Sequence, residues 1–175
     1  MISGKLEKAL NKHLNLELYS AYLYAAMAAY FEHKNLNGFA HWMRLQVQEE
    51  MVHATKFYAY IHDIGGRVEL DGIAKPPADY KSPLAIFEDA YGHEQTVTKA
   101  IYKLMDLALA ESHHATSTFL QWFVTEQVEE EKVADDIVKR LRLVGSSPEG
   151  LFMMDRELGA RTVSAEVAGG GEGAK

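Results

Sequence analysis

Hydrophobic residues recur at helical spacing through residues 39–64, and two positions of that apolar seam are occupied by Glu50 and His53. The seam consists of Phe39, Met43, Gln46, Glu50, His53, Phe57, Tyr60 and Ile64. Side chains on such a seam face whatever the helix packs against. Because a buried carboxylate costs several kcal/mol unless it is paired, protonated or coordinated to a cation, Glu50 needs a partner inside the fold.

Glu50 and His53 are three residues apart, which places the carboxylate and the imidazole side by side on one helix face. Both side chains can then bind one small cation. A single Glu-x-x-His pair is a weak motif, because most such pairs lie on solvated surfaces. Its meaning therefore depends on whether the other apolar seams of the chain are interrupted in the same way.

Three further stretches, residues 5–32, 82–111 and 115–144, have the helical period, and polar residues interrupt each seam near its middle. The interrupting residues are Glu17 in the first stretch, Glu94 in the second, and Gln127 with Glu130 in the third. One inward Glu in a helix can be accidental. Four interruptions at matching levels indicate one buried cluster of four carboxylates, an imidazole and an amide.

The segments between these stretches predict an all-α fold, a four-helix bundle with one long crossover connection. Short polar turns at 35–38 and 112–114 predict antiparallel neighbours, whereas the Pro-containing segment 67–82 is long enough to cross the bundle and shows alternation for at most one short strand. A short fifth helix is expected over 148–158. We expect one domain over residues 1–161, followed by a disordered Gly-rich tail over 162–175.

The composition excludes several classes of function. The chain of 175 residues has no cysteine, which removes disulfides, thiolate metal sites and iron–sulfur clusters. Its formal charge is -7 and no basic stripe is present, so nucleic acid is not an expected partner. No apolar run approaches the roughly 20 residues of a membrane span, and the first residues lack a signal core, so we expect a cytoplasmic protein without membrane contact.

Four anions in a hydrophobic core repel one another unless protons or multivalent cations occupy the site. Carboxylate-rich coordination with one nitrogen ligand suits iron or manganese better than zinc. Two metal ions bridged by Glu50 would make the site binuclear. Tyr24 lies two turns beyond Glu17, where it is either a core tyrosine or a residue that hydrogen-bonds a ligand or supplies an electron.

The chain closely resembles the non-haem ferritins of bacteria and archaea over residues 6–161. The segments that carry the resemblance are 15–24 (NLELYSAYLY), 38–43 (GFAHWM), 48–54 (QEEMVHA), 65–68 (GGRV), 119–123 (FLQWF) and 126–131 (EQVEEE). The resemblance implies an iron-storage ferroxidase, which oxidises Fe(II) with O2 or H2O2 and stores the ferric mineral in a cage of 24 subunits.

At the matching positions, the resemblance implies that one iron is bound by Glu17, Glu50 and His53. The second iron's ligands are Glu50, Glu94 and Glu130, with Gln127 nearby. It also implies a third, outer iron position at Glu49, Glu126 and Glu129, which would carry iron between the diiron centre and the cavity.

The chain differs from haem-containing bacterioferritins, which have a second Glu-x-x-His where this chain has Gln127-x-x-Glu130. Met51 nevertheless matches the position of their haem-ligating methionine. We favour a packing role for Met51, because methionine fills cores and interfaces without any metal.

Three other functions fit parts of the pattern. A rubrerythrin-like peroxidase would reduce peroxide without storing iron, but the chain has no cysteine-based rubredoxin module. A passive storage subunit would lack the inward carboxylates, which are all present here. A DNA-binding miniferritin would place its metal site between subunits and often has a basic tail, whereas residues 162–175 contain one lysine.

Overall fold

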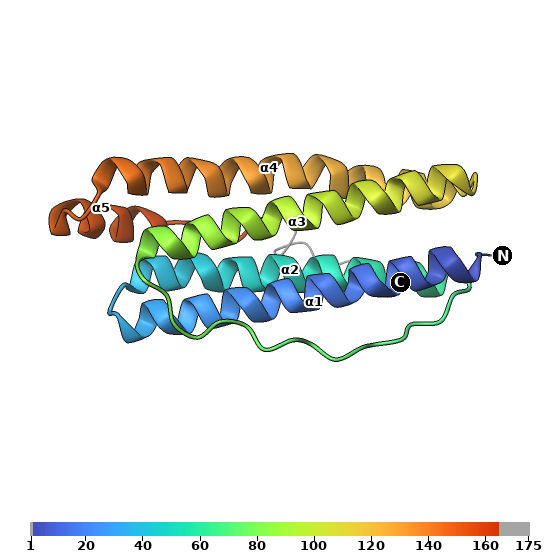
Figure 1. The fold of residues 1–175 in the computed structure, drawn as a ribbon, viewed down its shortest axis with the longest axis horizontal. Coiled ribbons are helices and arrows are strands. Elements are labelled where there is room, and N and C mark those ends of the chain that lie inside the picture. The colour runs from blue at the N-terminus through green and yellow to red at the C-terminus, as the bar shows by residue number, and fades with distance from the viewer. Residues whose placement is uncertain (1, 165–175) are drawn as a thin grey trace.

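The computed structural model describes residues 2–164 of the chain, and five helices account for most of them (Figure 1). The helices are α1 (Gly4–His33), α2 (Asn37–Asp63), α3 (Pro83–Ala110), α4 (His114–Val144) and α5 (Pro148–Leu158). The predicted all-α class and the five helices are confirmed, and each predicted boundary lies within two residues of the observed one. The apolar period located the helices correctly because each one is long.

Three helices begin at serines whose hydroxyl oxygens accept hydrogen bonds from backbone N–H groups. Ser3 caps α1, and Ser82 and Ser147 cap α3 and α5, each followed by a proline at the first helical position. Gly65 lies two residues beyond the end of α2, and Gly145 directly follows α4. Their φ values are +74° and +59°. Glycine adopts this left-handed conformation without steric cost, so both glycines favour helix termination.

Helices α1 and α2 form one antiparallel pair, α3 and α4 form the other, and α1 also contacts α3. The connection between α2 and α3 runs along the length of the bundle in Figure 1. It contains no helix or strand, so the short strand that the sequence allowed is absent from this segment. Because the crossover returns the chain to the opposite end of the bundle, α2 and α3 run roughly parallel, as predicted.

Helix α5 is fixed to the beginning of α2 by a cap that comes from far along the chain. Asp155 Oδ1 accepts hydrogen bonds from the N–H groups of Gly38, at 2.7 Å, and Phe39, at 3.0 Å. A Cβ atom on Gly38 would lie 1.6 Å from the carbonyl oxygen of Asp155, so only glycine allows this approach. Helix α2 has no side-chain cap from its own N-cap residue, Leu36.

The core consists of two apolar clusters with a polar layer between them. The cluster nearer α5 includes Tyr24, Phe39 and Phe87. The other cluster includes Leu14 and Phe123, near the opposite end of the bundle. Along α1, the buried Glu17 falls between residues of the two clusters, and the same is true of the interrupting residues on α2, α3 and α4. The polar layer is therefore enclosed by hydrophobic packing on both sides.

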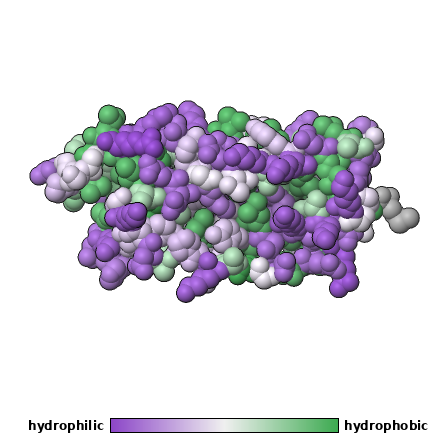
Figure 2. All heavy atoms as spheres, in the orientation of Figure 1, coloured by the Kyte–Doolittle hydropathy of each residue, from purple (hydrophilic) through white to green (hydrophobic). Residues whose placement is uncertain are grey.

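The visible face in Figure 2 is mostly hydrophilic, and hydrophobic atoms show at the end of the bundle where α5 lies. Among the described residues of that end, Leu143, Phe152 and Met153 are exposed. No described helix has the length and apolar content that crossing a membrane requires. Most of the predicted disordered tail lies outside the described residues, and 162–164 form no helix or strand.

Candidate metal centre

All six residues that interrupt the apolar seams are buried, and they come from four helices. Their exposed fractions are Glu17 0 %, Glu50 2 %, His53 2 %, Glu94 1 %, Gln127 3 % and Glu130 7 %. The predicted inward orientation of these side chains is therefore what the structure has. Four long helices converge here, so residues up to 113 positions apart share one layer of the core.

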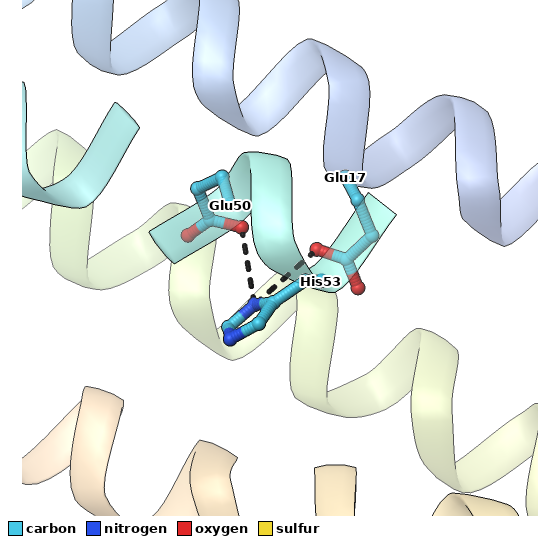
Figure 3. A group of neighbouring side chains, drawn as sticks. All are labelled: Glu17, Glu50 and His53. Atoms are coloured by element: carbon cyan, nitrogen blue, oxygen red, sulfur yellow. Dashed lines mark ion pairs between the residues drawn. The ribbon is translucent and has the colours of Figure 1, made fainter. Parts of the chain in front are cut away.

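Glu17, Glu50 and His53 form a compact group in which each residue offers one ligand atom within 4.8 Å of the others (Figure 3). His53 Nδ1 lies 3.5 Å from Glu50 Oε2 and 3.9 Å from Glu17 Oε2. In Figure 3 both carboxylates point toward the same edge of the imidazole. Two oxygens and one nitrogen that face a common point are a suitable donor set for a single divalent ion.

Glu17 is held from its other side by His13, one helical turn earlier. His13 Nε2 lies 2.7 Å from Glu17 Oε1, and His13 itself is buried and packs against the ring of Phe57. Oε2 of Glu17 accepts no hydrogen bond from an N–H or hydroxyl group of the described residues. Although burial raises the pKa of Glu17, the imidazoles of His13 and His53 lower it below its ordinary value. Glu17 is thus an anion with one oxygen available.

Glu94 is oriented by two donors from neighbouring helices. The hydroxyl group of Tyr24 on α1 donates a short hydrogen bond to Glu94 Oε1. The amide of Gln127 on α4 donates to Glu94 Oε2 at 3.1 Å, and the same nitrogen lies 3.3 Å from Thr98 Oγ1. Tyr24 and Gln127 therefore hold the Glu94 carboxylate rather than being isolated polar groups in the core.

Glu130 on α4 faces α2, where it accepts a hydrogen bond from Gln46 Nε2 at 3.0 Å. The amide oxygen of Gln46 is buried and has no hydrogen-bond partner among the described residues. A buried polar atom of this kind is costly unless a water or a cation contacts it. Gln46 thus belongs to the polar layer, although we assigned it only to the seam of α2.

Protons accumulate in this layer when no metal is bound. Burial raises the pKa of Glu50 well above its ordinary value, and the carboxylates of Glu94 and Glu17 raise it further. Burial also raises the pKa of Glu130, and the negative charges of Glu94 and Glu49 raise it further. For Glu94, burial raises the pKa to about 7. A multivalent cation would replace these protons, so the layer has the electrostatic character of a metal centre.

The three residues assigned to an outer iron position lie in different surroundings. Glu49 is buried and forms an ion pair with Arg161, with 2.6 Å between Oε2 and Nη2. Glu126 is half-buried and Glu129 is exposed on α4. Met51, assigned to haem in the related bacterioferritins, is 45 % exposed on α2 and is not part of the polar layer.

Sequence reasoning missed His13, Gln46 and Arg161. His13 precedes Glu17 by four residues and Gln46 precedes Glu50 by four, so both share a helix face with a carboxylate, and this spacing is a signal that was available. Arg161 follows the last helix, and its contact with Glu49 spans 112 positions. No local pattern predicts such a contact.

The profile of the family described as ferritin-like domain matches residues 7–144. A bacterial non-haem ferritin of Bacteroides fragilis is 44% identical over 161 residues, which cover 92% of this chain and 100% of the relative. One from Staphylococcus aureus is 39% identical over 166 residues, covering 95% of this chain and 100% of the relative.

Solved structures give the same result. An open-pore ferritin from the hyperthermophilic archaeon Archaeoglobus fulgidus has a TM-score of 0.92 and 49% identity, covering 93% of this chain and 100% of that one. A variant of that ferritin, engineered into a closed form, has the same TM-score and identity, with coverages of 94% and 100%. The fold, the buried Glu17, Glu50 and His53 group and these similarities agree, and the chain belongs to the ferritin family as a non-haem ferritin.

Proposed function

We propose that this ferritin stores iron by oxidising Fe(II) at a two-iron centre within each subunit. The observation that carries the proposal is the convergence of four buried carboxylates and one imidazole from four helices on one layer of the core. A layer of this kind has no packing function, because hydrophobic residues of the same volume would be at least as stable there. Metal binding explains why the chain keeps it.

The two iron positions are assigned by geometry and by resemblance together. The first Fe(II) would bind Glu17, Glu50 and His53, the group whose donor atoms lie within 4.8 Å of one another. The second would bind Glu50, Glu94 and Glu130, with Gln127 beside it. Glu50 then contacts both ions, which is consistent with its central position among the carboxylates that influence its pKa.

The reaction needs two electrons, and the substrate pair supplies them. Each Fe(II) loses one electron, and O2 takes up two electrons and two protons to become H2O2. When H2O2 is the oxidant, its O–O bond is cleaved by two electrons and two protons, which gives two waters. Fe(III) then hydrolyses, releasing protons as the mineral forms.

The protein contributes charge and orientation. Ionised carboxylates stabilise Fe(III) more than Fe(II), so they favour electron loss. Tyr24 and Gln127 hold both oxygens of Glu94, which limits the reorganisation that accompanies the change in charge. Of the two roles considered for Tyr24, we propose the hydrogen bond to Glu94, because the two Fe(II) ions already supply both electrons.

Assembly and location complete the proposal. The ferritin family implies an oligomer, and we propose a cage of 24 subunits. Exposed Phe152 and Met153 on α5, at 70% and 71%, support burial against other subunits. We propose that the cage works in the cytoplasm, where cell fractionation would find it.

We also propose roles for the outer acidic residues and for Met51. A third iron position would use Glu49, Glu126 and Glu129, which we support by resemblance and by the charge of Glu49, which raises the pKa of Glu130 on α4, the helix that carries Glu126 and Glu129. For Met51 we propose surface packing without haem. Purified protein that shows a Soret absorbance band in proportion to subunit pairs would contradict that assignment.

The test is aerobic addition of Fe(II) to metal-free protein, followed by ferric absorbance. The Glu50→Ala, His53→Ala double variant is compared with Glu88→Ala, which removes an exposed carboxylate of α3, and each is sized by gel filtration. We expect the assembled double variant to oxidise Fe(II) at least tenfold more slowly than wild type and Glu88→Ala. Equal rates for all three assembled proteins would contradict the proposed ferroxidase centre.

A further inference from the structure

Arg161 reaches from the segment after α5 to the outer edge of the metal centre. Its Nη2 donates a hydrogen bond to Glu49 Oε2 at 2.6 Å, and its Nη1 lies 3.5 Å from the carbonyl oxygen of Trp42. The guanidinium carbon is 4.7 Å from the centroid of the Trp42 ring, a cation–π contact. Three separate contacts therefore place this cation on a buried carboxylate.

The main chain at Arg161 is also fixed. His41 Nε2 lies 2.8 Å from the carbonyl oxygen of Arg161, and α5 itself is attached to α2 by the Asp155 cap and the close approach at Gly38. The ion pair is thus a consequence of how α5 docks. It differs from the solvent-exposed ion pairs of this surface, which contribute little to stability.

The pair lies at the boundary of the proposed two-iron centre. Glu49 is adjacent in sequence to Glu50, and the charges of both Glu49 and Arg161 influence the pKa of Glu130, in opposite directions. An iron ion that left the polar layer on this side would encounter Glu49, whose negative charge Arg161 already neutralises.

We propose that Arg161 is a displaceable internal cation, which competes with iron for Glu49 and so keeps the third iron position weak until the guanidinium moves away. The inference rests on the proposed two-iron function and deepens it. Arg161 would act as a positioning residue that sets when Glu49 becomes a ligand, without itself touching the oxidised pair.

The chemistry of arginine determines how this competition works. The guanidinium group of arginine stays charged at any working pH, and it has no lone pair that could bind a metal ion. It therefore cannot join iron as a ligand, and deprotonation cannot remove its charge. Iron can gain Glu49 only when the side chain swings out. A pocket of about 320 Å³ adjoins Arg161 and offers the displaced guanidinium space. Asp136 in its wall offers counter-charge, whereas Glu157 is already paired with Arg140.

The experiment measures how many metal ions bind and how tightly. Co(II), which air does not oxidise in this setting, is titrated calorimetrically into the assembled metal-free protein. We compare wild type with Arg161→Gln, Arg161→Lys and Arg140→Gln. Arg140 is the matched control, because it lines the same pocket and pairs with Glu157 of α5 but does not contact Glu49. Its substitution removes the same charge from the same region.

We expect two tight ions in each subunit of wild type and a weaker third. Arg161→Gln should bind the third ion about tenfold more tightly, within the usual range of coupling between competing ligands. Arg161→Lys keeps a cation near Glu49 and should stay near wild type, as should Arg140→Gln. Adding Glu49→Gln to Arg161→Gln should remove the gain.

Two results would overturn the inference. One is an unchanged affinity for the third ion in assembled Arg161→Gln. The other is a gain that persists when Glu49→Gln is added, or that Arg140→Gln reproduces. The proposed function is judged separately by the tight ions: fewer than two in wild type would contradict the two-iron centre, whereas the effect of Arg161 is measured on the Glu49-dependent ion alone.

Discussion

His13 Nε2 lies 2.7 Å from Glu17 Oε1 in the interior of the bundle, and this contact leaves Oε2 as the only oxygen of Glu17 that faces His53. An imidazole that donates to one oxygen of a carboxylate fixes the direction of the other oxygen. The pair thus prepares Glu17 to bind metal through a single atom.

Replacing His13 tests this preparation. We expect His13→Leu to weaken Co(II) binding at the first position by about tenfold, because hydrogen-bond partners of metal ligands are usually worth 10–100-fold in affinity. His13→Gln, whose amide can donate to the same oxygen, should recover most of the loss. Visible Co(II) absorbance in an anaerobic titration measures both, and equal affinities for His13→Leu and wild type would refute the role.

Tyr24→Phe removes one of the two donors that hold Glu94. We expect the initial rate of Fe(II) oxidation to fall by about tenfold in a cage of normal size, because Glu94 keeps only its contact with Gln127. Tyr30→Phe is the control, since the hydroxyl group of Tyr30 donates to the carbonyl oxygen of Tyr80, outside the polar layer. If both variants slow oxidation equally, the effect does not arise from Glu94.

The raised pKa of Glu94 predicts that the metal-free protein loses stability as the pH rises. In the folded protein its pKa is about 7, against 4.5 for the unfolded reference, so the folded state holds a proton that the unfolded state has lost between these values. The stabilisation that Glu94 contributes is fully present below pH 4.5 and is lost as the pH rises to about 7. The shift corresponds to about 3 kcal/mol.

Urea denaturation of metal-free protein at pH 5 and at pH 7.5 measures this loss. Glu94→Gln is the control, because a neutral amide cannot titrate, and its stability should change less over the same range. Saturating Mn(II) at pH 7.5 should restore the wild-type midpoint, since a bound cation replaces the protons. A wild-type midpoint that falls no more than that of Glu94→Gln would show that Glu94 does not hold the proton.

Gly38→Ala is expected to detach α5 from α2. The new Cβ atom would lie 1.6 Å from the carbonyl oxygen of Asp155, and backbone atoms cannot yield as a flexible side chain does. We expect a loss of about 1–3 kcal/mol in stability, as overpacking generally causes, with weaker cage assembly. Gly92→Ala, at an open position on α3, is the control. Gel filtration and thermal denaturation would report the difference, and matching results for the two variants would contradict the close contact.

The sequence predicted the helices and the inward carboxylates because both follow from one period. Because the apolar seam of residues 39–64 repeats every 3.6 residues, Glu50 on that seam must face the core in any helix bundle. The sequence did not predict how those carboxylates are held. Tyr24 contacts Glu94 across 70 positions and Asp155 caps α2 across 117, distances over which no periodic signal extends. His13 lies between these cases, since its spacing from Glu17 is local and only its burial was unforeseen.

The most direct test of the two-iron centre is an anomalous X-ray difference map of crystals of this protein loaded with Co(II). We expect two strong peaks in each subunit, both in contact with Glu50, with Glu17 and His53 at one peak and Glu94 and Glu130 at the other; the proposed third position would add a weaker peak at Glu49. A single strong peak, or strong peaks that lie away from Glu50, would contradict the inference that the four interrupted seams form a binuclear metal centre.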